Sequence, residues 1–290
     1  DSGNPVTDFY IPALERATHY DRKSGFFSSA ILSSAILSHV ASGLGAMLQN
    51  AGSNQGKIRL IMGCQLSKAD LEAIQQGYAL RDTVATNLEA SLTPPANFAQ
   101  LKRLEILSWL VQTGHLDIKI AIPLKQNGTP LSPDETLDTH YIFHEKVCIF
   151  TDIAGHQLVT TGSNNESVGG WTHNIESFHV FCSWEDQREV ERVQGEVLRF
   201  EQLWNNLTPN VRVFEVPEAV KRKLMRIAPP QKPNWQPQDE FNNRPLKPEE
   251  KQPFESGSQP DSETDATVEP PADPEKLSEN SIDPNAIARE

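Results

Sequence analysis

Short runs of alternating apolar and polar residues recur along the first 228 residues, and segments with helical spacing of apolar positions separate them. The strand-like runs cover residues 20–27, 57–62, 116–122, 141–150, 157–161 and 175–184. Helical spacing covers residues 31–48, 67–74, 98–111 and 185–206. This order of strands and helices predicts an α/β fold, a sandwich in which helices flank a mixed sheet.

The composition changes near Ala228. Residues 229–290 are rich in proline and acid, and they hold too few large apolar residues to offset their chain entropy by burial. We therefore expect a folded domain over residues 1–228 and a disordered linker or tail over residues 229–290. The tail carries 14 acidic and 6 basic side chains, a net of −8. The total net charge of −13 thus leaves only −5 for residues 1–228, a balance that permits a local basic groove.

The chain begins at Asp1 rather than Met and ends in a linker-like segment, so we expect a piece of a longer protein with a further domain after the tail. No run approaches the roughly 20 apolar residues needed to cross a bilayer, and no secretory signal is visible. The three cysteines each lie in an apolar strand-like run, and they are Cys64, Cys148 and Cys182. Buried, reduced thiols and a cytoplasmic protein are therefore expected.

Residues able to grip and attack a phosphodiester gather between positions 144 and 176. His144 and Lys146 lie two apart on a predicted strand and so point to the same face. The intervening and following residues are expected to point into the core: Glu145, Val147 and Ile149. A tight connection near residues 154–155 lets the next strand pair back, which brings Ser163 and Asn165 toward the histidine. An imidazole, an ammonium group and two neutral donors then converge.

The pattern HEK followed by GSNN resembles the H-x-K and G-S-x-N signature of the phospholipase D superfamily. It is most similar to the branch of nucleases with a single motif, and to the phospholipase D-like domains that precede helicases in restriction and phage-defence proteins. The preceding layout, a GFF strand, a helix, KIRLIMG and a second helix, is similar to the opening of those domains. The resemblance covers roughly residues 8–206.

The resemblance implies a role for each matching residue. His144 would attack phosphorus and form a covalent phosphohistidine, while Lys146, Ser163 and Asn165 would hold the non-bridging oxygens. Glu176, eleven residues after the motif asparagine, would bond the other ring nitrogen of the histidine and fix its tautomer. Such a site needs no metal and no cofactor.

Two features of the sequence bear on whether this motif forms a complete catalytic site. The family aspartate falls at Thr151, with Asp152 one residue later, which leaves open whether the pocket cuts phosphodiesters or only binds them. The chain holds one H-x-K, whereas the mechanism needs a second histidine to protonate the leaving oxygen. A two-fold homodimer with two copies of His144 facing each other is the simplest solution.

Together with the linker-like tail, the resemblance implies a metal-independent phosphodiesterase, a DNA endonuclease more than an RNase. It would be tethered through the tail to a helicase or ATPase domain and have no membrane partner. Two alternatives stay open: a non-catalytic module for nucleic-acid binding or dimerisation, and a phospholipid phosphodiesterase. The individual residues also have plainer interpretations. His144 alone resembles a core histidine. Tyr20, Arg22 and Lys23 on the first strand could line the same groove, but a solvated strand end accounts for them equally well. The charges of residues 185–199 are typical of the exposed face of a helix.

Overall fold

The computed structural model describes residues 6–25, 41–50, 56–63, 82, 86, 94–131, 143, 145–162, 177–234, 239 and 242–255. Contacts divide the chain into two units, Asp1–Glu255 and Ser256–Glu290. All described residues belong to the first unit. The fold described below is therefore that of the first unit.

One mixed sheet organises the described residues, with the strand order β6-β5-β4-β1-β2-β3-β7. The strands are β1 (Ala17–Ser24), β2 (Lys57–Gly63), β3 (Leu116–Pro123), β4 (Val147–Asp152), β5 (Gln157–Gly162), β6 (Phe178–Cys182) and β7 (Val211–Glu215). β1, β2 and β3 run parallel at the centre, and all other pairings are antiparallel. Parallel strands require crossover connections, which matches the helix-sized spacing between these three strands.

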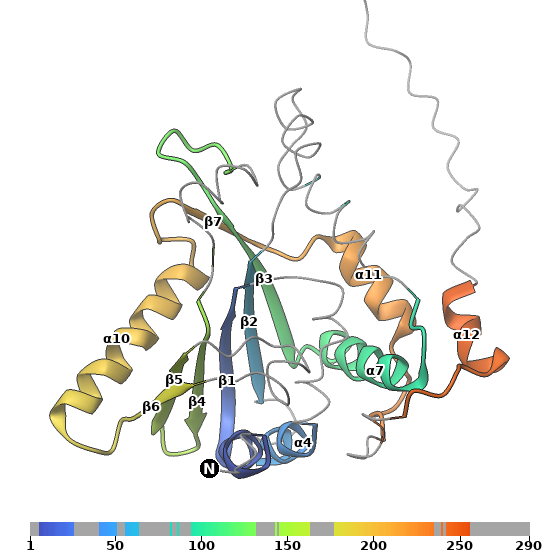
Figure 1. The fold of residues 1–290 in the computed structure, drawn as a ribbon, viewed down its shortest axis with the longest axis horizontal. Coiled ribbons are helices and arrows are strands. Elements are labelled where there is room, and N and C mark those ends of the chain that lie inside the picture. Colours follow the sequence, from blue (N-terminus) through green and yellow to red (C-terminus); the bar gives the residue numbers. More distant parts are fainter. Residues whose placement is uncertain are drawn as a thin grey trace, which may run out of the picture. The chain divides into compact units, whose positions relative to one another are not determined.

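Helices cover both faces of this sheet, as Figure 1 shows with α10 on one side and α4, α7 and α11 on the other. The helices are α1 (Ile11–Arg16), α4 (Ala41–Asn50), α7 (Phe98–Gln112), α10 (Gln187–Trp204), α11 (Glu218–Ile227) and α12 (Pro248–Glu255), after a π-helical segment η1 (Val6–Tyr10). Even-numbered residues of β2 and β4 pack into the core on the α7 side, as does Tyr20 of β1. On the α10 side the core contains odd-numbered residues of β2 and β4, namely Ile61, Val147 and Ile149. The central strands are thus buried on both faces.

The prediction of an α/β fold with a mixed sheet flanked by helices is confirmed. The predicted strands at 57–62, 116–122 and 157–161 and the helices at 98–111 and 185–206 correspond to β2, β3, β5, α7 and α10. Asn97 caps α7 and Asp186 caps α10 through side-chain oxygens that accept backbone N–H groups. The predicted helix at 67–74 lies outside the described residues, as do Ser28 and Ser29.

Five elements were missed by the prediction, namely η1, α1, β7, α11 and α12. Two strands were also placed too early. β4 begins at Val147 rather than at residue 141, although residues 141, 142 and 144 are not described, and β6 spans only Phe178–Cys182. β7 was missed because a short edge strand with charged residues resembles a loop when its partner is unknown.

The folded unit extends beyond the predicted boundary at residue 228. Phe98 and Ala99 donate their amide N–H groups to the carbonyl oxygens of Arg244 and Asn242, at 3.1 Å each. The Arg244 guanidinium lies 4.0 Å from the centre of the Phe98 ring and forms a bidentate ion pair with Glu250. Residues 242–255 therefore dock on the start of α7, and the boundary lies after Glu255. Because the segment is rich in proline, its sequence pattern does not reveal these few strong contacts with α7.

The docking of residues 242–255 is expected to weaken in acid. The hydrogen bonds from Arg244 lower the pKa of Glu250 to about 2 from its ordinary 4.5. Because the folded-state pKa is the lower one, this contribution to stability is complete above pH 4.5 and is lost as the pH falls toward 2. NMR shifts of the Phe98 and Ala99 amides, followed from pH 6 to pH 2, measure the loss. Glu250→Gln should abolish the transition, and an unchanged transition in that variant would contradict this account.

Candidate functional site

The carboxyl ends of the three parallel strands meet at one end of the sheet, together with the start of β4 and the end of β5. In open α/β sheets this is where ligands usually bind. β1 ends at Ser24 next to Met62 of β2, and Lys23 faces Val147, the first residue of β4. Residues from distant parts of the sequence therefore meet here.

Lys146 and Gly162 are direct neighbours at this end of the sheet. The Gly162 amide N–H donates to the Lys146 carbonyl oxygen at 3.3 Å, one residue beyond the register in which Val147 faces Thr161. Lys146 is only 6% exposed. The β4–β5 hairpin thus brings together the predicted H-x-K and G-S-x-N segments at their described residues, as the alternating pattern predicts.

Gly162 lies against the start of β6, and this explains why the position holds glycine. A methyl group at Gly162 would lie 2.5 Å from the Ser177 carbonyl oxygen and 2.7 Å from the Phe178 Cα. Both neighbours are backbone atoms that cannot yield cheaply, so a side chain here would push two strands apart. Three chain segments therefore converge within contact distance: the start of β4, the end of β5 and the start of β6.

Of the five predicted site residues, the structure describes Lys146. The other four lie outside the described residues: His144, Ser163, Asn165 and Glu176. Their roles remain predictions. Three of them have described neighbours in the sequence. His144 lies between Phe143 and Glu145, Ser163 follows Gly162, and Glu176 precedes Ser177.

The prediction that Glu145 points into the core is wrong. Its side chain is 51% exposed and forms an ion pair with Lys23, whose own side chain is 1% exposed. Val147 and Ile149 are buried as expected. Glu145 does share their face, but it lies at the end of the sheet, where the buried Lys23 ammonium offers a partner that the sequence pattern could not reveal.

Tyr20, Arg22 and Lys23 are buried, so the interpretation of a solvated strand end is wrong for them. Lys23 also lies 3.6 Å from Glu196 of α10, which in turn bonds Arg199. Part of the charge on α10 therefore faces the sheet rather than solvent. The expected exposed face is formed by other residues of this helix, such as Arg192.

A second ion-pair network joins β1 and β2 to the end of α10. The Arg59 guanidinium donates to both carboxylate oxygens of Asp21 at 2.6 Å and to Glu201 at 2.7 Å. It also stacks near the rings of Phe200 and Trp204, at 4.8 and 5.4 Å from their centres. Burial opposes the charged state of Arg59, but the bonds from the two carboxylates outweigh it and raise its pKa above the ordinary value. This network ties β1, β2 and α10 together.

Thr151, which stands where the family motif has aspartate, lies at the far end of β4 from Lys146. Five residues along a strand correspond to roughly 16 Å. Asp152 instead organises the β4–β5 turn: its side chain accepts the N–H groups of Ala154 and His156 and bonds the His156 ring. These bonds outweigh the effect of burial and lower the pKa of Asp152. The altered motif position is therefore remote from the convergence point.

Cys148 and Cys182 are free thiols on β4 and β6. Cys148 is buried as predicted, whereas Cys182 is half-buried. Partial burial, with the nearby charges of Glu185 and Glu189, raises the pKa of the Cys182 thiol. Cys64 lies outside the described residues.

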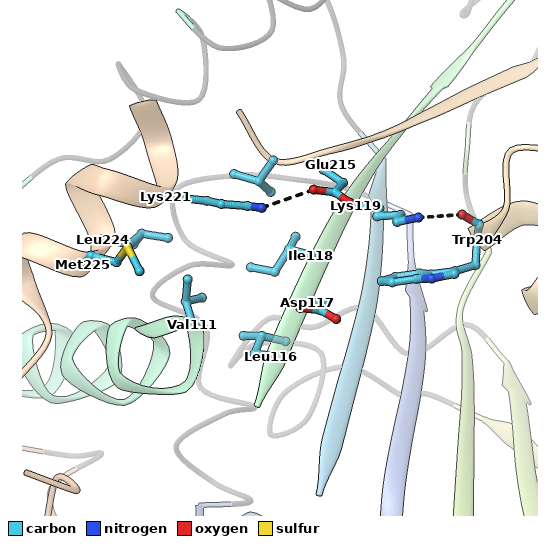
Figure 2. A pocket seen from close by; sticks show the side chains of 11 residues that line it. Val111, Leu116, Asp117, Ile118, Lys119, Trp204, Glu215, Lys221, Leu224 and Met225 are labelled. Atoms are coloured by element: carbon cyan, nitrogen blue, oxygen red, sulfur yellow. Dashed lines mark hydrogen bonds and ion pairs between the residues drawn. The ribbon is translucent and has the colours of Figure 1, made fainter. Parts of the chain in front are cut away.

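A cavity of about 390 Å³ lies elsewhere, beside the first half of β3 and between α7, α11 and the end of α10 (Figure 2). Val111, Leu116 and Leu224 supply part of its apolar wall. Figure 2 shows the two lysines of the cavity already engaged, Lys119 with the Trp204 carbonyl oxygen at 2.9 Å and Lys221 with Glu215 at 3.3 Å. Lys146, the described member of the predicted site, does not line this cavity.

Comparison with known proteins gives likeness to solved structures but no match to a protein family. No protein-family model matches the chain, and no curated protein matches its sequence. A solved structure that aligns with it is Nuc, a phospholipase D family member from Salmonella typhimurium. The two chains are 13% identical with a TM-score of 0.33, and the alignment covers 70% of this chain and 87% of that one. At this level of similarity no residue role can be transferred.

The described residues contain no group of three or more histidine, cysteine, aspartate or glutamate side chains arranged to hold a metal ion. None of the described helices is long and apolar enough to span a membrane.

Proposed function

We propose that the chain is a metal-independent phosphodiesterase of phospholipase D type that cuts DNA through a covalent phosphohistidine on His144. The observation that carries the proposal is the convergence of the described neighbours of the motif residues. Lys146 bonds Gly162, and Gly162 lies against Ser177. His144, Ser163 and Glu176 are each one or two residues from these positions, and one residue spans at most about 3.8 Å.

In this proposal a ring nitrogen of His144 attacks phosphorus, and the bond from phosphorus to the leaving oxygen breaks. Lys146, Ser163 and Asn165 hold the non-bridging oxygens, where negative charge builds up. Glu176 accepts a hydrogen bond from the other ring nitrogen and keeps the attacking nitrogen unprotonated. Water then hydrolyses the phosphohistidine and regenerates the imidazole.

The leaving oxygen needs a proton from a second histidine, because His144 is the nucleophile in that step. We propose that a second copy of the chain supplies it, with two copies of His144 facing each other across a two-fold axis. The acidic tail tethers the module to a helicase or ATPase domain of a defence or restriction protein. Thr151 does not preclude catalysis in this scheme, since its position lies at the far end of β4.

Cleavage in the presence of excess EDTA tests the proposal. The protein should cut DNA at the same rate with and without the chelator. Quenching with denaturant at alkaline pH should trap a labelled phosphate on the protein that is stable to base and labile to acid, as expected for phosphohistidine. Parallel reactions with RNA and with phosphatidylcholine vesicles separate the substrate classes. Cleavage that requires added magnesium would refute the proposal. DNA binding without cleavage would instead support the non-catalytic alternative, and activity on vesicles alone the phospholipase alternative.

A further inference from the structure

Arg22 is a charged side chain buried at 2% exposure in the middle of the sheet, on β1. It faces Leu60 of β2 and Cys148 of β4 in the strand register. Side chains of paired residues lie on the same face, so Arg22 belongs to the face covered by α1, α4 and α7. A guanidinium is costly to bury, so its position here requires compensating interactions.

The Arg22 guanidinium is held toward β4 on this face. It donates to the Cys148 sulfur, which also accepts a weak bond from the Tyr20 hydroxyl at 3.5 Å and lies 4.0 Å from the Tyr10 hydroxyl. The thiol contacts the Nη1 end of the guanidinium, and both tyrosine rings belong to the same buried cluster as Cys148. Arg22 is therefore held in a defined direction rather than free to turn out to solvent.

Lys146 shares this face. It lies two residues before Cys148, and its carbonyl bond to Gly162 continues the ladder of β4 and β5 by one residue. Alternation then directs Lys146 to the side of Cys148 and away from Val147, which packs under α10. Diagonal neighbours on adjacent strands stand about 7–8 Å apart, within joint reach of one phosphate for two long cationic side chains. Ser24, also buried, follows on the same face.

Lys23, the next residue of β1, lies on the opposite face of the sheet and pairs with carboxylates. Lys23 points toward α10 and pairs with Glu145 and Glu196. Adjacent residues of one strand thus present one cation to carboxylates and the other to the face that carries Lys146. This contrast supplies a matched control one position away.

We propose that Arg22 is a second phosphate-binding residue of the site, which grips a non-bridging oxygen of the same phosphodiester that Lys146 holds. This inference rests on the proposed function for the identity of the site. A guanidinium can bond two phosphate oxygens in parallel, which a lysine cannot. The pair would hold the phosphate rigidly from β1 and β4, two adjacent strands of the sheet.

The test titrates the full chain with inorganic phosphate by calorimetry and measures kcat/KM on DNA in EDTA, for Arg22→Gln, Arg22→Lys and Lys23→Gln. Arg22→Gln should weaken phosphate binding and lower kcat/KM by roughly 10- to 100-fold, the loss of a charge-assisted bond. Arg22→Lys keeps the charge but not the paired donors, and should lose less. Lys23→Gln should change phosphate affinity by less than about threefold, whatever it does to the unfolding temperature.

Each other outcome decides the matter. Unchanged phosphate affinity in a folded Arg22 variant, or an equal loss in Lys23→Gln, overturns the inference, as does a wild-type chain that binds no phosphate. If Arg22→Gln does not fold, Arg22→Lys decides, and failure of both to fold assigns Arg22 a purely structural role. Phosphate binding that depends on Arg22 in a chain that cuts no DNA would uphold this inference while refuting the proposed function.

Discussion

Replacing His144 with alanine is expected to lower the rate of DNA cleavage by roughly 10⁴-fold or more, because the covalent route is lost with the nucleophile. The measurement is a single-turnover assay in EDTA, with circular dichroism to establish folding. His156→Ala is the matched control, since that histidine is exposed and bonds Asp152 at the far end of the β4–β5 hairpin. Retention of more than about a tenth of the activity in His144→Ala would show that another group attacks the phosphate.

The same variant tests whether two copies complete one site. When wild-type and His144→Ala chains are refolded together in equal amounts, about one quarter of the dimers contain two wild-type chains and half contain one. If each reaction needs both histidines, the activity should fall to about one quarter of that of the wild-type chains alone at the same total concentration. A value of one half would mean that each chain acts independently.

The central sheet was predictable because its signals are local. KIRLIMG alternates with period two, and LDIKIAI does the same before a turn with Asn127 and Gly128. Gly128 adopts a φ of +82°, which explains the glycine at that turn. α7 begins where Asn97 caps it, directly after the Pro94-Pro95 break. Patterns of this kind depend on a few adjacent residues, so they can be interpreted without knowing what packs against them.

The burial of charge was not predictable. Arg59 and Glu201 are 142 residues apart, and each looks like an ordinary polar residue in its own segment. The same holds for Lys23, whose partners come from the start of β4 and from α10. A strand with the sequence YDRK is typically partly solvated, and only the pairing of β1 with two neighbours buries both of its faces. Such information lies in the tertiary contacts, not in the sequence pattern.

The hairpin that joins the candidate motifs was predictable in part. The sequence predicts that β4 and β5 pair around residues 154–155, and Lys146 and Gly162 do meet. It does not predict that Gly162 contacts Ser177, because β6 begins later than its apolar run suggests. Both observations favour the same convergence point, one by local pattern and one by packing.

Replacing Arg59 with methionine is expected to cost about 2–4 kcal/mol of unfolding free energy, because it leaves Asp21 and Glu201 without the cation between them. The partial exposure of Glu201 keeps the estimate below the largest values known for buried pairs. For a unit of this size the unfolding temperature should fall by roughly 5–12 °C, measurable by calorimetry. Arg192→Met is the control. Arg192 pairs with Glu189 on the exposed side of α10, so its loss should cost less than about 0.5 kcal/mol.

The unfolding free energy lost in Arg59→Met should also depend on pH. This dependence distinguishes the cost of an unpaired Asp21 carboxylate from the cost of lost packing. Burial already raises the pKa of Asp21 above its ordinary value, against the opposing bond from Arg59. Without Arg59 the pKa of Asp21 in the folded state must rise further. The variant is therefore least destabilised below the ordinary Asp21 pKa of 3.8, where the carboxyl is protonated in both states. It is most destabilised once the pH exceeds the folded-state pKa of Asp21. Stability measured from pH 4 to pH 7 should therefore diverge from that of the wild type, and Asp21→Asn added to Arg59→Met should remove the divergence. A loss that is equal at every pH would assign the role of Arg59 to its stacking on Phe200 and Trp204 instead.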